Sequence, residues 1–173
     1  MAACRVALRL RQPTLPCRRL PLRRLTCLAA SSSLRIDVGA AGLPHPRKKT
    51  QGEDAYTTAT TASSVLLGVA DGVSSSNDGG RYAHALMDAV RDSFLCNKDG
   101  ESLIHPSDML TEAWQACKLV EGRSTACLVT LDLLPPQPRI RTANMGDSAM
   151  WLLRRRADRG GRLGIALKSI PQV

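Results

Sequence analysis

The sequence predicts an α+β fold, in which helices and antiparallel strands form separate layers. Apolar residues recur every three or four positions in two stretches between residues 81 and 120, as on one face of a helix. Short apolar or β-branched runs bounded by turn residues occupy most of the remainder. We therefore expect two strands, two helices and then four antiparallel strands, within a length that suits one domain.

Two strands are expected before the helices, and the second of them ends at an aspartate. Residues 34–38 alternate as in a half-buried strand, and the Gly/Pro-rich residues 39–47 predict a loop. A Thr-rich stretch at 57–61 follows, and threonine is common in strands. The apolar run Ser64–Ala70 stops at Asp71, which predicts a buried strand that delivers this carboxylate into a turn.

Two helices are expected next. The first begins at Arg81, and its apolar face comprises Tyr82, Leu86, Ala89, Val90 and Phe94. The second follows Pro106, with Ser107 as the cap and Asp108 complementing the positive end of the helix, and it ends at Gly122. Its predicted buried stripe comprises Leu110, Ala113, Trp114, Cys117 and Val120.

The last part of the chain predicts four antiparallel strands. Residues 125–134 are apolar and β-branched, and the two prolines that follow favour a strand over a helix. The other expected strands are 139–143, 149–154 and 162–168, the last two joined by a hairpin turn at 158–161. Because only 3% of residues are aromatic, the core should be aliphatic.

The formal net charge of +9 is concentrated in an amino-terminal leader. Eight arginines precede the first acidic residue, Asp37. We interpret residues 1–33 as an organelle transit peptide, with a mitochondrial destination favoured and a plastid as the alternative. A solvated disordered arm is the second interpretation. A nucleic-acid arm ranks third because no aromatic residue is available to stack on bases. Residues 34–173 form the expected domain.

No apolar stretch approaches the roughly 20 residues of a membrane-spanning helix, so no membrane span is expected. The six cysteines include no Cys-x-x-Cys pair, which argues against a zinc site or a disulfide framework.

Acidic residues beside glycines mark three strand ends or tight turns. They are Glu53-Asp54, Asp71-Gly72 and Gly146-Asp147. A carboxylate at the mouth of a buried strand is costly unless a cation meets it, and an all-oxygen ligand set selects Mg²⁺ or Mn²⁺. Each pair taken singly also fits a plain turn.

Four segments, in order, resemble motifs of the PP2C-type (PPM) metal-dependent protein phosphatases. They are GED at 52–54, GVADGV at 68–73, GRSTA at 122–126 and ANMGDS at 143–148. The resemblance covers about residues 34–168, and the amino-acid sequence of the motifs is most similar to that of the organellar PPTC-like branch. It implies a PP2C-like layered fold of antiparallel β-sheets flanked by helices, incomplete at the C-terminus.

The resemblance also implies roles for individual residues. In this family, two metal ions share a water that attacks phosphorus, without a covalent intermediate. Asp71 would bridge both ions, Gly72 would offer its carbonyl, and Asp54 would coordinate mainly through water. Glu53 would support that set of ligands, and Asp147 would belong to a third, more labile metal region. Asp71 and Asp54 are thus the implied catalytic residues.

The sequence departs from the family pattern in three respects. Lys49 stands where many relatives place a phosphate-binding arginine, and a solvated loop lysine is an equal interpretation. Val73 replaces a histidine that often follows the Asp-Gly pair, and His84 is expected to be an ordinary exposed helix residue. No acidic residue follows Asp158, although family domains usually supply two further metal-binding aspartates late in the chain.

The expected function is metal-dependent hydrolysis of phosphoserine or phosphothreonine in proteins, with two or more Mg²⁺ or Mn²⁺ ions. The alternative is a truncated, inactive pseudophosphatase or gene-model fragment that acts at most as a phosphoprotein-binding module. A basic nucleic-acid-binding protein is a third reading, which the segregation of arginine into the leader opposes. We therefore expect a monomer that takes a phosphoprotein as its substrate and binds no nucleic acid.

Overall fold

The computed structural model describes residues 3–11, 35–43, 52–73, 79–96, 105–133, 138–156, 160–170 and 172. Their elements are β1 (Ala3–Arg11), β2 (Arg35–Leu43), β3 (Asp54–Thr60), β4 (Ser64–Asp71), α1 (Gly79–Cys96), α2 (Pro106–Ala116), β5 (Ala126–Asp132), β6 (Arg139–Met145), β7 (Trp151–Arg155) and β8 (Leu163–Lys168). The chain divides into one unit over Ala7–Gly39 and another over Met1–Val6 with Ala40–Val173. All elements from β3 to β8 belong to the second unit.

A four-stranded antiparallel sheet in the order β3-β4-β5-β6 forms the centre of this unit. Both helices lie in the connection between β4 and β5. The strands expected at 64–70, 125–134 and 139–143 are confirmed, as is the pairing of the last two. The α+β class is therefore confirmed.

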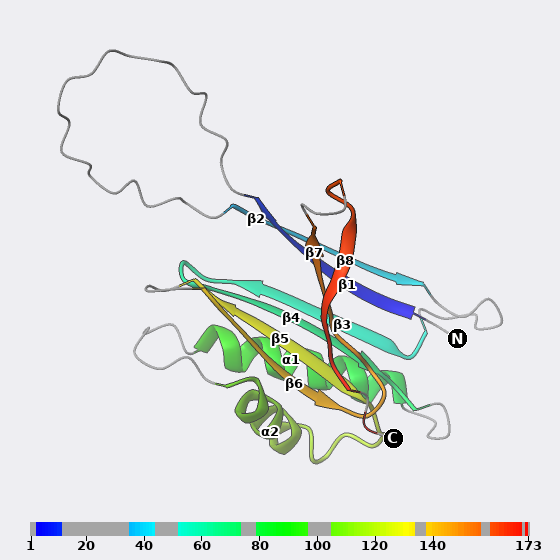
Figure 1. Ribbon diagram of the computed structural model, residues 1–173. Coiled ribbons are helices and arrows are strands. Elements are labelled where there is room, and N and C mark those ends of the chain that lie inside the picture. The colour runs from blue at the N-terminus through cyan, green and yellow to red at the C-terminus, as the bar shows by residue number, and fades with distance from the viewer. Residues whose placement is uncertain are drawn as a thin grey trace, which may run out of the picture. The chain divides into compact units, whose positions relative to one another are not determined.

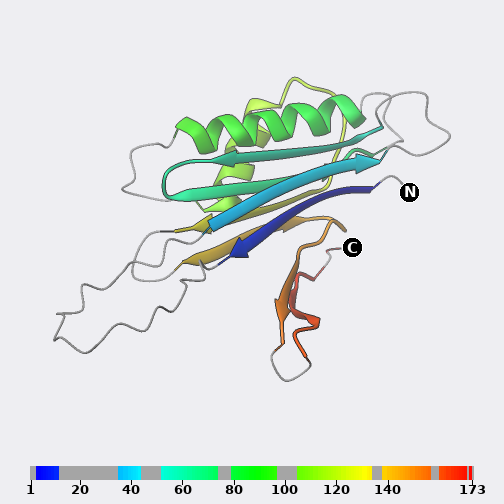
Figure 2. The same ribbon diagram turned by 90° about the horizontal axis from the view of Figure 1, so that it is seen from above.

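The helices cover one face of this sheet (Figures 1 and 2). α1 packs against β3 and β4, and α2 packs against β5, β6 and α1. The strand residues beneath them are mostly small or aliphatic, and the buried cluster includes Ala55, Ala59, Leu66, Ala70, Leu86, Met87, Val90, Met109, Ala126 and Leu128. The core is therefore aliphatic, as the composition predicts.

The second helix differs from its prediction at both ends and in its buried face. His105, not Ser107, is the N-cap, and its ring accepts a hydrogen bond from the Ser107 backbone N–H. Proline suits the first helical position, so the cap falls on the residue before Pro106. The helix ends at Ala116, well before Gly122.

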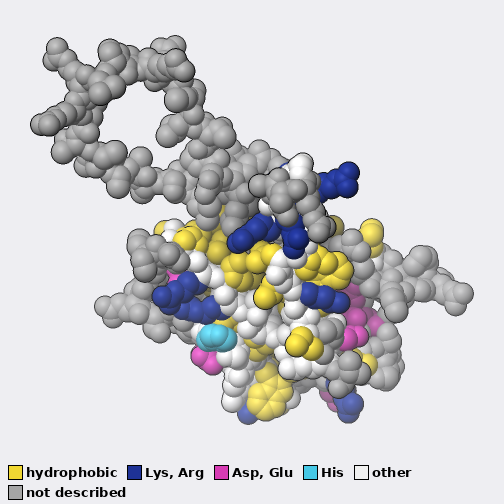
Figure 3. All heavy atoms as spheres, in the orientation of Figure 1, with side chains coloured by type: hydrophobic (Ala, Val, Ile, Leu, Met, Phe, Trp, Pro, Cys, Tyr) yellow, Lys and Arg dark blue, Asp and Glu magenta, His cyan; other side chains and the backbone are white. Residues whose placement is uncertain are grey.

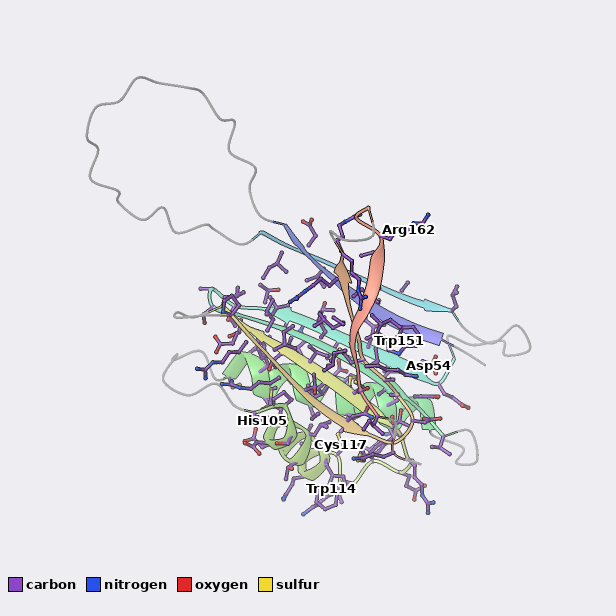
Figure 4. The ribbon with its side chains drawn as sticks, viewed as in Figure 1. Asp54, His105, Trp114, Cys117, Trp151 and Arg162 are labelled. Carbon is purple, nitrogen blue, oxygen red and sulfur yellow. The ribbon has the colours of Figure 1, made fainter. Side chains whose placement is uncertain are left out.

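The buried face of α2 is rotated from the predicted stripe, because it is formed by Pro106, Met109 and Ala113, with Cys117 buried just beyond the helix. Trp114 is 53% exposed and projects away from the sheet (Figure 4). The Lys118 ammonium lies 5.3 Å from the centre of the Trp114 ring, so this aromatic ring is paired at the surface.

Three further strand assignments differ from or extend the sequence prediction. β2 includes Gly39–Leu43, which the sequence predicts as a loop. Pairing with β1 satisfies the backbone N–H and C=O groups of this segment independently of its side chains. β1 lies within residues 1–33, where no strand is expected, and the transit peptide stays a prediction. β7 and β8 form the expected hairpin, but in a separate two-stranded sheet.

In the described part of the chain, no helix combines the length and apolarity needed to cross a membrane.

We predict that Gly68→Ala destabilises the protein by about 1–3 kcal/mol, as overpacking of a core does. A Cβ at residue 68 would lie 2.8 Å from side-chain carbons of Leu128 and Thr57 and 3.1 Å from the Met87 sulfur. Urea denaturation would measure the change. The control is Gly39→Ala in β2, where a Cβ would meet nothing within 4 Å. Equal stability changes in the two variants would contradict this packing argument.

Candidate metal centre

Two carboxylates face each other where β3 begins and β4 ends. Asp54 and Asp71 are directly opposite in the register of these strands. The next pair, Glu53 and Gly72, is hydrogen-bonded through the backbone, with the Gly72 N–H donating to the Glu53 carbonyl at 3.1 Å. Asp54 and Asp71 therefore form a non-hydrogen-bonded pair, whose side chains lie closer together and share one face of the sheet.

The face that carries this acidic pair is the one opposite the helices. Ala55 and Ala70, the adjacent residues on the two strands, belong to the core beneath α1. Because successive side chains in a strand alternate between faces, Asp54 and Asp71 point away from that core. Figure 4 shows Asp54 at one end of the sheet, and Figure 3 shows acidic side chains gathered at that end. Asp54 is half-buried and Asp71 is exposed, so the pair is accessible from solvent.

The environment of Asp71 disfavours its ionised form. Partial burial, then the negative charge of Asp54 and a hydrogen bond between the two side chains, raise the pKa of Asp71 to about 6. Asp147 and Glu53 raise this pKa further through their negative charges. The charges of three acidic residues thus act on Asp71, and a cation beside this carboxylate would favour its ionised form.

The turn that carries Asp147 follows β6. Asp147 is exposed, and Gly146 before it has a φ of 85°, a left-handed conformation that glycine adopts readily. A side chain at Gly146 would also collide with Thr125, because its Cβ would lie 2.8 Å from the Thr125 methyl carbon. The turn is therefore held close to the beginning of β5.

The remaining predicted site residues have separate outcomes. Gly72 is buried and bridges to Ser124 of the segment before β5, while half-buried Glu53 contributes its backbone carbonyl to the Gly72 bond. Lys49 lies outside the described residues. His84 is exposed on α1, as expected.

The donor chemistry of this centre fits a hard divalent cation only in part. Carboxylate oxygens are the ligands that Mg²⁺ and Mn²⁺ prefer, and the opposed side chains of Asp54 and Asp71 supply them. Among the residues that the structure describes, no three His, Cys, Asp or Glu side chains are gathered closely enough to hold a metal ion. Two carboxylates are therefore in place, and Asp147 acts on Asp71 through its charge.

Sequence reasoning missed two residues of this centre, Thr125 and Ser148. Both lie in segments that resemble the family motifs. Their hydroxyl oxygens are 2.6 Å apart, and the Thr125 hydroxyl accepts a hydrogen bond from the Asp71 backbone N–H at 3.2 Å. The sequence carries no signal for these contacts until the register of β4 and β5 is known.

We predict a pH-dependent stability difference between the metal-free protein and its Asp71→Asn variant. The ordinary pKa of this carboxyl is 3.8, against about 6 in the folded chain. Between these values, the folded state binds more protons than the unfolded state, so the Asp71 contribution to stability falls as pH rises. Urea denaturation in EDTA from pH 4 to pH 7 should show the parent losing stability relative to Asp71→Asn. A stability difference that is constant over this range would contradict the raised pKa.

Comparison with known proteins identifies similar sequences. The chain is 35% identical over 130 residues to "Probable protein phosphatase 2C 71" of Oryza sativa subsp. japonica, which covers 72% of this chain and 26% of the relative. It is 31% identical over 134 residues to "Probable protein phosphatase 2C 80" of Arabidopsis thaliana, covering 75% of this chain and 30% of the relative. It is also 35% identical over 114 residues to "Protein phosphatase PTC7 homolog" of Homo sapiens, covering 60% of this chain and 35% of the relative.

No family model matches the chain, and no solved structure matches it. The chain spans 26–35% of the length of these three relatives. The similarity to several phosphatases of one type agrees with the antiparallel sheet, the two helices and the order of the four acidic and glycine-rich motifs. Over the matched region, this chain belongs to the PP2C-type protein phosphatase family.

Proposed function

We propose that this chain carries part of the catalytic centre of a metal-dependent protein serine/threonine phosphatase. The observation that carries this proposal is the pairing of Asp54 and Asp71, together with the charges of Glu53 and Asp147 that act on Asp71. The relatives of similar sequence, named as protein phosphatases, support the same reaction class.

The proposed centre assigns a task to each acidic residue. Asp71 and Asp54 hold Mg²⁺ or Mn²⁺ through their carboxylate oxygens. Asp147 adds negative charge from the neighbouring turn, and Glu53 fixes the start of β3 through the backbone bond to Gly72. Bound divalent cations acidify water and neutralise the charge of a phosphoryl group.

Substrate recognition is proposed at the level of chemical class. The substrate is a phosphoprotein, and Lys49 is the proposed phosphate contact, because an ammonium binds phosphate as a point charge. Val73, which follows the Asp-Gly pair, offers no proton to a leaving group, so this proton has another source. The proposed state is a monomer.

A phosphate-release assay tests the activity. The full chain should release phosphate from a phosphothreonine peptide when Mn²⁺ or Mg²⁺ is present and not in EDTA. Asp71→Asn should lower the rate by about 100-fold or more. Mutation of a residue that only hydrogen-bonds to a metal ligand already lowers activity about 10–100-fold, and loss of the ligand itself should cost more. The charge-matched control is Asp92→Asn on α1, an exposed residue that should leave the rate unchanged.

Two results would count against this assignment. Equal rates in the parent and Asp71→Asn would exclude the acidic pair from the metal centre. A folded parent without metal-dependent activity would instead favour the inactive, phosphoprotein-binding alternative, which retention of a phosphopeptide on the immobilised chain would support.

We also propose that residues 1–33 direct the chain to the mitochondrion, on the basis of their arginine content and lack of acidic residues. A fusion of residues 1–40 to a fluorescent protein should colocalise with a mitochondrial marker. Plastid fluorescence in plant cells would support the alternative destination, and diffuse fluorescence would contradict both.

A further inference from the structure

The hydrogen bonding between Asp71 and Thr125 departs from a regular antiparallel ladder. The register of β4 and β5 extends beyond the paired strands and places these two residues opposite each other, since Gly72 bridges to Ser124. The Thr125 N–H donates to the Asp71 carbonyl at 2.9 Å, as in a hydrogen-bonded pair. The reciprocal bond of a regular pair would run from the Asp71 N–H to the Thr125 carbonyl.

A side chain takes over this reciprocal bond. The Asp71 N–H donates to the Thr125 hydroxyl at 3.2 Å, and the Thr125 carbonyl accepts a bond from the Ser124 hydroxyl at 2.7 Å. The backbone position of Asp71 therefore depends on a hydroxyl group, at the residue that also carries the carboxylate of the acidic pair.

The same hydroxyl contacts the turn that carries Asp147. The Thr125 and Ser148 oxygens are 2.6 Å apart, so one of them donates to the other. The Thr125 methyl group lies against Gly146, where a Cβ would be only 2.8 Å away. A hydroxyl has one proton and two lone pairs, so it can bond to Asp71 and to Ser148 at once.

We propose that Thr125 is a positioning residue, whose hydroxyl fixes Asp71 relative to the turn that carries Asp147. The effect of Thr125 on cation binding rests on the proposed metal-dependent function. Its coupling of the end of β4 to the turn that carries Asp147 does not depend on that function. Without this hydroxyl, the Asp71 N–H and the Ser148 hydroxyl both lose a partner, and the strand end and the turn lose the side-chain link between them.

Two substitutions separate the hydroxyl of Thr125 from its shape. Thr125→Val keeps the branched shape and removes the oxygen, whereas Thr125→Ser keeps the oxygen and removes the methyl group. The matched control is Thr111→Val on α2, an exposed threonine whose hydroxyl bonds to the Ser107 carbonyl at 3.0 Å. All variants are made in the full chain and compared by thermal unfolding.

The first measurement is amide hydrogen exchange and chemical shift in the metal-free protein. Thr125→Val should speed exchange of the Asp71 amide about two- to tenfold, the equivalent of one hydrogen bond, and should shift the Asp147 and Ser148 signals. Thr125→Ser should leave the exchange rate of the Asp71 amide like that of the parent. An unchanged Asp71 amide in a folded Thr125→Val protein would overturn the proposal, as would equal effects of Val and Ser.

The second measurement is binding of Mn²⁺ alone, followed by electron paramagnetic resonance. Thr125→Val should weaken binding about 10–100-fold, as loss of a supporting group does, while Thr125→Ser and Thr111→Val should bind like the parent. Parent-like Mn²⁺ affinity in Thr125→Val would overturn the positioning role. Absence of Mn²⁺ binding in the parent would reject the proposed function and the metal role together, and the exchange measurement would then decide the coupling alone.

A further variant keeps the proposal falsifiable if Thr125→Val does not fold. Ser148→Ala removes the second partner of the Thr125 hydroxyl and leaves the bond to Asp71 possible. It should shift the Asp71 amide signal in the metal-free protein, because the two bonds share one oxygen. An Asp71 signal identical to that of the parent would show that the turn and the strand end are not coupled.

Discussion

The candidate site depends on one constraint: two like-charged carboxylates, Asp54 and Asp71, are held opposite each other at the end of a β-sheet. Left alone, such a pair is unfavourable, since like charges directly opposite destabilise a sheet. The core on the other face enforces the arrangement. A slip of one residue would move Ala55 and Ala70 away from α1, so the register that buries them also sets the acidic pair.

The sequence predicted the elements whose side-chain pattern is strong and local. α1, β4 and β5 carry pronounced apolar patterns, and β6 follows β5 across a Pro-rich turn; the structure has all four at the expected places. The face of α2 could not be predicted as well, because Met109 and Trp114 are both apolar and only the neighbouring helix and strands decide which is buried. β2 was only partly predicted, since strand pairing accepts the glycine and alanine residues that otherwise indicate a loop.

The candidate site also contains residues that the sequence predicted and one that it could not predict. Asp54 and Asp71 could be proposed from acidic residues at strand ends and from a family resemblance, and the register brings both together. The contribution of Thr125 could not be predicted, because it depends on two strands that are remote in sequence and on a ladder bond that the side chain replaces. Neither the residue type nor its neighbours indicate which partner a threonine hydroxyl will take. That choice is settled by tertiary contacts.

The placement of both helices between β4 and β5 has a kinetic consequence. The contact from Asp71 to Thr125 spans 54 positions of the chain, so it closes a long loop whose entropy must be offset before the contact forms. Contacts of this range slow folding, and they form after local helical turns. The contact of Asp71 with its supporting hydroxyl should thus be completed late, when both helices have already docked. Asp54 and Asp71 lie in the local β3–β4 hairpin, so a chain that stalls before that point would have the acidic pair without this support.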